Sequence, residues 1–145
     1  KGERHGIRKR MAVLTPAGVV GQVVSAGPHA AHVLFISAPS SGIDALVQRS
    51  RVPGIVSGTL AGHCLLKYVQ HGSDVQVGDV IITSGLDEIF PKGQPIGSVA
   101  RVATRDDGLF QDIEVVLSAE LAKIEEVLVV APAVVRARAE RLGGE

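Results

Sequence analysis

The chain has 145 residues, and its composition and charge exclude several classes of protein. Fifteen basic residues balance fifteen acidic ones, and residues 11–130 carry seven basic against twelve acidic side chains, which argues against a nucleic-acid surface. The single cysteine, Cys64, rules out an intramolecular disulfide, and no apolar run approaches the roughly 18 residues that a membrane-spanning helix needs.

Short strands separated by tight turns make up most of the predicted structure. The chain is rich in valine and isoleucine and contains 17 glycines and 7 prolines, a composition typical of strands between turns. Turn signals recur about every 8–12 residues, which predicts an all-β fold with little helix. Helical periodicity is weak and limited to residues 118–125 and 134–142. The predicted strands are Met11–Thr15, Val19–Ala26, His32–Ser37, Val52–Gly58, Cys64–Gln70, Asp79–Ser84, Ile96–Thr104, Gln111–Ser118 and Glu126–Val130.

An internal repeat relates residues 11–23 to residues 79–99. In each copy an apolar strand is followed by a turn and then by a second strand that contains glycine. Two similar units within one short chain predict two small β-barrels packed together.

The stretch GDVIITSGLDEIFPKG, residues 78–93, combines an apolar strand with residues that suit its two ends. Glycine and aspartate at its start favour a turn, and the small hydroxyl side chains of Thr83 and Ser84 can satisfy backbone groups where the strand ends. Residues 90–93, Phe-Pro-Lys-Gly, fit a type I turn with proline second and glycine fourth. Every unusual residue of this stretch therefore has a structural interpretation.

A small serine peptidase is the catalytic alternative, with Ser84, His63 and Asp79 as its residues. A Ser–His–Asp triad needs mutual hydrogen bonds and an oxyanion hole. Ser84 lacks the Gly-Asp-Ser-Gly-Gly type of nucleophile loop, and a triad spread over two complete barrels requires a longer chain. We therefore predict no catalytic residues and expect that the protein is not an enzyme.

The five histidines do not show the spacing of a metal site. His29 and His32 are three residues apart and His63 adjoins Cys64, so on strands each pair points to opposite faces. No glycine loop of the phosphate-binding type occurs either. We predict neither a metal nor a cofactor. Residues 1–10 are basic and could contact phosphates, but the chain has few aromatic residues to stack on bases, and we expect a solvated edge.

Several runs in a fixed order resemble the MreC family of rod shape-determining proteins. The resemblance covers residues 1–131, and its most specific part is the Gly-Asp, Thr-Ser-Gly, Phe-Pro-Lys-Gly and Gly-Ser-Val series between residues 78 and 99. Matching runs also occupy residues 19–24, 49–58 and 66–69. The residues that we expect to shape the fold are Gly21, Gly54, Gly58, Gly78, Asp79, Thr83, Ser84, Gly85, Pro91, Gly93 and Gly97.

The resemblance implies a scaffold on the periplasmic side of the bacterial inner membrane. The family protein is anchored by an N-terminal membrane helix absent here, and the missing initiator methionine also suggests a fragment. The implied partners are a class B penicillin-binding transpeptidase, other membrane proteins of the rod complex, and the protein itself as a dimer or filament. A barrel module of a periplasmic adaptor is an alternative with a similar short-strand pattern.

The implied architecture is two small barrels, of which the second is chymotrypsin-like without a catalytic triad. We expect residues 1–40 to form the first barrel, completed by residues 119–131, and residues 41–118 to form the second. Residues 132–145 are expected to be a loosely ordered tail. Apolar residues in turn-rich segments are candidates for partner binding, unless they plug the barrel ends as core. These candidates are Tyr68, Ile89, Phe90, Leu109 and Phe110.

Overall fold

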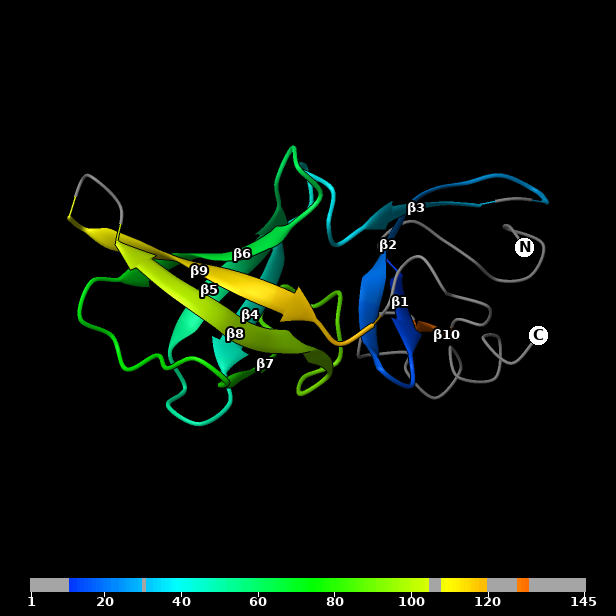
Figure 1. The fold of residues 1–145 in the computed structure, drawn as a ribbon. Helices are drawn as coiled ribbons and strands as arrows, with labels where there is room; N and C mark the ends of the chain where they lie inside the picture. The colour runs from blue at the N-terminus through cyan, green and yellow to red at the C-terminus, as the bar shows by residue number, and fades with distance from the viewer. Residues whose placement is uncertain (1–10, 30, 105–107, 120–127, 131–145) are drawn as a thin grey trace.

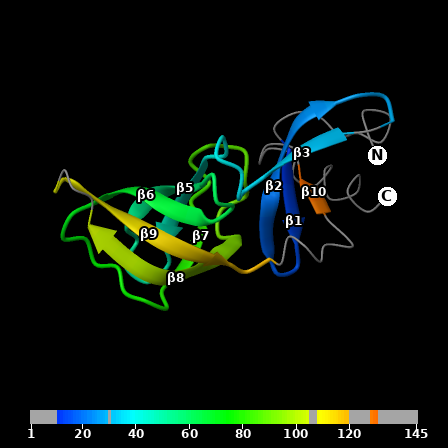
Figure 2. The ribbon, with the colours of Figure 1, turned by 45° about the horizontal axis from the view of Figure 1, so that its top comes forward.

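Ten strands form two units that lie side by side (Figures 1 and 2). The structure is a computed structural model that describes residues 11–29, 31–104, 108–119 and 128–130. The predictions for residues 1–10 and 132–145 therefore lie outside the described residues. The strands are β1 (Ala12–Thr15), β2 (Gly18–Ala26), β3 (Ala31–Phe35), β4 (Ile43–Val47), β5 (Pro53–Gly58), β6 (Cys64–Gln70), β7 (Val80–Thr83), β8 (Pro95–Thr104), β9 (Phe110–Leu117) and β10 (Leu128–Val130).

The prediction of an all-β fold is confirmed, and the two units differ in how far they close. Strands β4-β5-β6-β9-β8-β7 form a closed antiparallel barrel, which we call the barrel. Strands β10-β1-β2-β3 form a four-stranded antiparallel sheet, which we call the sheet unit. Within the described residues the sheet unit is open, with β3 and β10 at its edges. The described part of the chain contains no helix that could cross a membrane.

The two units are built on one repeated plan, as the internal repeat predicts. In the first copy Val13 pairs with Gly21, and in the second Ile81 pairs with Gly97. Each hairpin then shifts register at the next residue of its first strand. The equivalence extends beyond the repeat seen in the sequence, because β3 flanks β2 as β9 flanks β8, and β10 flanks β1 as β4 flanks β7. The sheet unit thus corresponds to four of the six barrel strands and has no counterpart of β5 and β6 among the described residues.

Gly21 and Gly97 occupy equivalent places because a neighbouring strand passes very close to each. A Cβ atom on Gly21 would lie 2.0 Å from the carbonyl oxygen of Leu34, and one on Gly97 would lie 2.1 Å from that of Val116. Both distances are far below any contact that a real Cβ atom makes. Glycine is therefore required at both positions for the third strand of each copy to pack.

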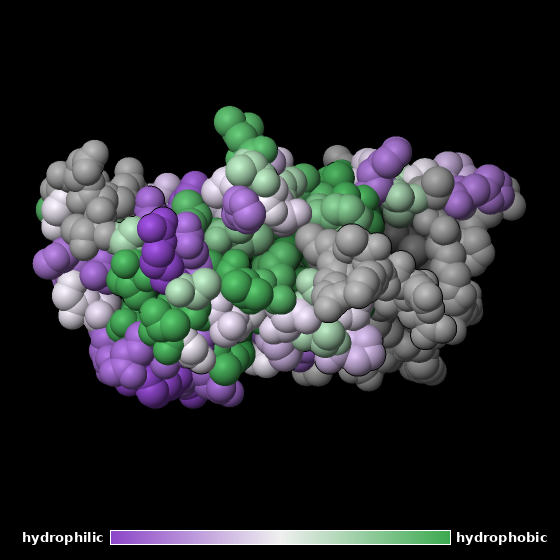
Figure 3. Space-filling view, viewed as in Figure 1, coloured by the Kyte–Doolittle hydropathy of each residue, from purple (hydrophilic) through white to green (hydrophobic). Residues whose placement is uncertain are grey.

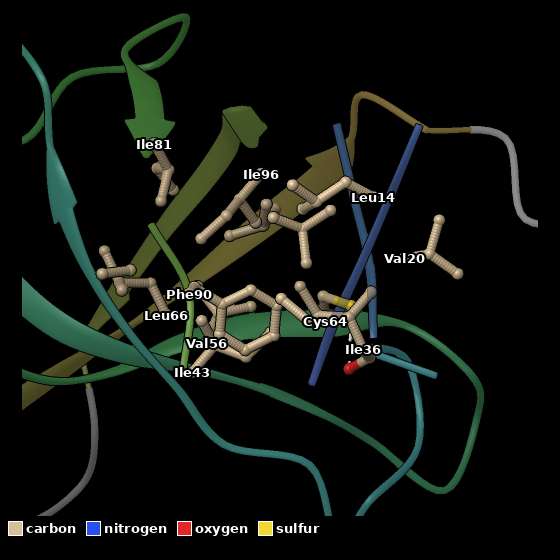
Figure 4. Packing of buried hydrophobic residues seen from close by; sticks show 14 of the residues in the cluster. Leu14, Val20, Ile36, Ile43, Val56, Cys64, Leu66, Ile81, Phe90 and Ile96 are labelled. Carbon is tan, nitrogen blue, oxygen red and sulfur yellow. Dashed lines mark hydrogen bonds between the residues drawn. The ribbon is translucent and has the colours of Figure 1, made fainter. Parts of the chain in front are cut away.

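One hydrophobic core runs through both units. Its members include Leu14, Val19 and Val23 of the sheet unit together with Phe90 and Ile96 of the barrel. Figure 4 shows Leu14 of β1 directed toward the barrel, where Ile96 and Phe90 lie. At the junction a Cβ atom on Gly18 would meet the carbonyl oxygen of Pro95 at 2.7 Å, so β2 begins directly against β8. The two units therefore share their interior.

Candidate partner-binding surface

The stretch from residue 78 to residue 93 is a structural corner of the barrel, held by Thr83. This threonine is fully buried at the end of β7. Its hydroxyl donates a hydrogen bond to the carbonyl oxygen of Pro91 (2.6 Å) and accepts one from the amide of Gln94 (2.8 Å). The turn that it spans centres on Lys92 and Gly93, one residue later than predicted, because Gly93 adopts a φ of 85° and so takes the position that requires glycine.

Asp79, at the other end of the same stretch, belongs to a cluster of charges. Arg49 donates two hydrogen bonds of 2.9 Å to the Asp79 carboxylate and two more, of 2.8 and 2.9 Å, to Asp74. The amide of Gln76 also donates to Asp79 (2.9 Å). The Arg49 guanidinium therefore holds the pKa of both carboxyl groups below their usual range. The cluster ties the turn after β4 to the loop before β7.

The residues of the catalytic alternative are not assembled into a triad. The Ser84 hydroxyl accepts a hydrogen bond from the Leu86 amide (3.3 Å), and the backbone amide of the exposed His63 donates to the hydroxyl of Thr59 (3.2 Å). The Asp79 carboxylate is occupied by Arg49, as described above. No hydrogen bond joins Ser84 to His63 among the residues that the structure describes. These contacts give each residue a local structural role.

The neighbouring Cys64 is also placed as a core residue. Its thiol is buried and donates a weak hydrogen bond to the carbonyl oxygen of Ile36 (3.7 Å; Figure 4). Burial raises the pKa of the Cys64 thiol to about 11, so the thiol is protonated at neutral pH. Among the described residues no group of three or more His, Cys, Asp or Glu side chains could hold a metal ion. His32 instead contacts the hydroxyl of Ser25 at 2.9 Å.

Two of the five candidate partner-binding residues belong to the interior. Phe90 is only 2% exposed and lies in the core, and Ile89 is half-buried against it. The reason is local, because the Asp87 carboxylate accepts hydrogen bonds from the amides of Ile89 (3.0 Å), Phe90 (3.3 Å) and Asp44 (3.2 Å). These bonds fold the loop back onto the barrel and direct the phenyl ring inward. Phe90 therefore takes the core alternative and does not offer a contact surface.

The other three candidates come together at one end of the barrel. The rings of Tyr68 and Phe110 meet edge to face, with centroids 6.0 Å apart. Tyr68 is 55% exposed and Leu109 is 67% exposed, whereas Phe110 is half-buried. We call these three residues the Tyr68 patch. They lie where β9 begins, at the end of the molecule farthest from the sheet unit (Figures 1 and 2).

An irregularity in β6 exposes the Tyr68 side chain. The pairing of β6 with β9 shifts register between Leu66 and Val69, and Tyr68 inside this bulge has a φ of 64°. A left-handed conformation is uncommon for a residue other than glycine and is frequent at functional sites. The flanking Leu66 and Val69 are fully buried, so the bulge fixes the outward direction of the tyrosine. The patch therefore presents the Tyr68 ring, in contact with Phe110, on the surface of the barrel.

Other exposed apolar residues were not among the candidates. Leu60, in the turn between β5 and β6, is 97% exposed. A hydrophobic projection stands over this hairpin at the top of Figure 3. Val33 and Phe35 of β3 are 37% and 45% exposed. Leu60 was missed because it stands alone beside Gly62 in a turn. The β3 pair was missed because both residues lie within a predicted strand, whereas the candidates were sought in turn-rich segments.

Comparison with known proteins identifies the family. Residues 1–131 match the family model described as "Rod shape-determining protein MreC, barrel core". The chain belongs to the MreC family. It is 30% identical over 129 residues to the cell shape-determining protein MreC of Escherichia coli, and 31% identical over 134 residues to that of Listeria monocytogenes. These alignments cover 88% and 89% of the chain but only 35% and 45% of the two relatives. The chain thus spans less than half the length of these relatives.

Solved MreC structures share the fold. The crystal structure of MreC from Pseudomonas aeruginosa superposes with a TM-score of 0.83 at 32% identity, covering 90% of this chain and 84% of that one. A complex between the penicillin-binding protein PBP2 and MreC from Helicobacter pylori contains a chain with a TM-score of 0.67 at 14% identity, covering 76% of this chain and 68% of that one. The second likeness concerns the fold alone.

Proposed function

We propose that this chain is a non-catalytic scaffold of the bacterial cell-elongation machinery. It would act on the periplasmic side of the inner membrane, with the membrane anchor in a part of the protein outside this chain. The observation that carries the proposal is membership of the MreC family over residues 1–131. The contacts that bind Ser84, Asp79 and Cys64 into the fold support a role without catalysis.

We further propose a class B penicillin-binding transpeptidase as a partner, together with other membrane proteins of the rod complex and a second copy of the chain. The Helicobacter pylori relative was solved in complex with PBP2, which supports the first of these. A scaffold raises the effective concentration of its partners and favours whichever partner conformation it binds more tightly. Its effect on the transpeptidase would therefore depend on differential affinity.

The Tyr68 patch is our candidate for the transpeptidase contact. Tyrosine and other aromatic residues are enriched in the residues that dominate binding energy, particularly where they are rigid and desolvate on binding. Tyr68 and Leu109 are exposed, and the edge-to-face contact with Phe110 holds the tyrosine ring in place.

We also infer a division into two domains, with residues 41–118 as one and residues 1–40 with 119–131 as the other. The closure of the barrel between β4 and β9 supports this division.

The test is a calorimetric titration of the chain with the periplasmic region of the transpeptidase from the same organism. Saturable binding is expected, and Tyr68→Ala or Leu109→Asp should each weaken it by at least about tenfold, which corresponds to about 1.4 kcal/mol. Leu86→Asp is the matched control, because Leu86 is also exposed, at 76%, but lies outside the patch. Unchanged affinity in both patch variants would move the contact elsewhere, and no binding by the parent chain would refute the partnership for this part of the protein.

A further inference from the structure

The bulge in β6 brings two residues of that strand opposite one residue of β9. The register shift between the two strands leaves Lys67 and Tyr68 together opposite Asp112. Side chains of a strand alternate between its two faces, and Ile113, next to Asp112, is fully buried inside the barrel. Asp112 therefore lies on the outer face, as does Phe110 two residues earlier, whose ring meets that of Tyr68. The Tyr68 patch thus has a carboxyl group as its neighbour.

The charge of Asp112 is not compensated within the described part of the chain. Every ion pair in that part belongs to Arg49 or Arg101, and Lys67 forms none with Asp112 although it lies opposite. The Oδ1 atom of Asp112 is buried and accepts no hydrogen bond there, and the Oε1 atom of the adjacent Gln111 is in the same state. Buried polar atoms of native proteins are nearly always bonded, so two exceptions in adjacent residues call for an explanation.

A cationic side chain of a binding partner would complete this arrangement. An ionised carboxyl group only accepts hydrogen bonds, and it accepts the strongest ones from a cation. The ring of Tyr68, which is 55% exposed, favours the same kind of group, because cations are attracted to the face of an aromatic ring. A guanidinium group can make both contacts, since it pairs with a carboxylate through two parallel N–H groups and stacks on aromatic rings. The chemistry of the two side chains therefore points to arginine.

We propose that Asp112 and Tyr68 form a subsite that receives an arginine side chain of the transpeptidase. This proposal rests on the proposed function and adds the chemistry of the contact. Asp112 would pair with the guanidinium group, while the exposed Leu109 would cover the apolar stem of the arginine. Folding has already removed water from one oxygen of the carboxyl group, so part of the desolvation cost of binding is met before the partner arrives.

The fluorescence of the chain offers a direct test of the subsite. Tyr68 is the only tyrosine and the chain has no tryptophan, so its emission reports on this place alone. N-acetylarginine amide at millimolar concentration should change the emission, and the uncharged N-acetylcitrulline amide should not. The response should be several-fold weaker in Asp112→Asn and unchanged in Glu114→Gln, the matched control on the same face of β9, whose carboxylate already pairs with Arg101. Equal responses in the parent chain and Asp112→Asn would overturn the proposal.

Calorimetry with the periplasmic region of the transpeptidase tests the source of the arginine. Asp112→Asn should weaken binding at least tenfold, whereas Glu114→Gln should leave it unchanged. Lys67→Met removes a charge that repels a cation and should not weaken binding; weaker binding would indicate an anionic partner group and overturn the proposal. Parent-like binding by Asp112→Asn would overturn it while the partnership stands. A parent chain that does not bind would overturn the transpeptidase as the source, and the response to N-acetylarginine amide would still decide the subsite.

The stability of the free chain separates a binding role from a structural one. Because the buried oxygen of Asp112 has no partner in the free chain, Asp112→Asn should unfold at the same Tm as the parent or higher. Asp79→Asn is the contrasting variant, since Asp79 accepts two hydrogen bonds from Arg49, and it should be less stable. A fall in Tm for Asp112→Asn as large as that for Asp79→Asn would show a structural partner within the chain and would overturn the proposal.

Discussion

Replacing Thr83 with valine tests whether the 78–93 stretch serves to hold the barrel. The substitution keeps the side-chain shape and removes only the hydroxyl, which is fully buried and makes one hydrogen bond to Pro91 and one to Gln94. Each unsatisfied buried group costs about 1–3 kcal/mol. Because Gln94 is only half-buried, we expect a total loss of roughly 2–4 kcal/mol in the free energy of unfolding. For a domain of this size that loss corresponds to a fall in Tm of roughly 7–14 °C.

The assay is chemical and thermal unfolding followed by circular dichroism, with Thr59→Val as the matched control. The Thr59 hydroxyl accepts one hydrogen bond, of 3.2 Å, from the exposed His63 amide, which water can replace. The control should therefore lose less than about 1 kcal/mol. If Thr83→Val were no less stable than Thr59→Val, the hydroxyl would not be what fixes this corner, and the structural interpretation of the stretch would fail.

Three further predictions concern pH and reactivity. Arg49 lowers the pKa of Asp74 and Asp79, so the contribution of these carboxylates to the free energy of unfolding is complete above about pH 4 and is lost as the pH falls through the lowered pKa values. Arg49→Met should therefore flatten the acidic part of a stability–pH profile. An unchanged profile would contradict this assignment. The buried Cys64 thiol should resist iodoacetamide in the native chain and react after unfolding, and rapid labelling of the native chain would disprove its burial. Because its pKa is raised to about 11, the contribution of the protonated thiol to the free energy of unfolding should be lost as the pH rises from about 9 toward 11. A fluorophosphonate should not label Ser84, and covalent labelling that Ser84→Ala abolishes would restore the peptidase alternative.

The sequence predicted the strands and the repeat well because alternation and turn residues are local signals. It missed β4, Ile43–Val47, although buried Ile43, Ala45 and Val47 alternate there with half-buried residues. The segment is short and contains Asp44 and Ala45, which have low strand propensity, so pairing with β5 and β7 decides its conformation. Whether a barrel closes depends on the same long-range pairing, which has no local signal in the sequence.

The candidate site was harder to predict than the fold. Phe90 and Phe110 look alike in sequence, since each is an aromatic residue in a turn-rich segment. The two side chains differ in burial because the Asp87 carboxylate folds the loop around Phe90 inward, whereas Phe110 begins a strand beside the bulge at Tyr68. Neither the carboxylate bonds nor the bulge has a sequence signal of its own. Exposure therefore had to be read from three-dimensional structure.

The pairing of β1 with β10 has a consequence for how the chain folds. Ala12 faces Val130 across this ladder, so the entire barrel is nested between two strands that must find each other. Closing so long a loop in an unfolded chain is slow, because contacts between distant residues form late and their closure entropy must be paid first. Once the barrel has folded, Ile36, which follows β3, and Val115 of β9 both lie beside Cys64, which shortens that search. We therefore expect the barrel to form first during synthesis, and the sheet unit to assemble only after residue 130 has left the ribosome.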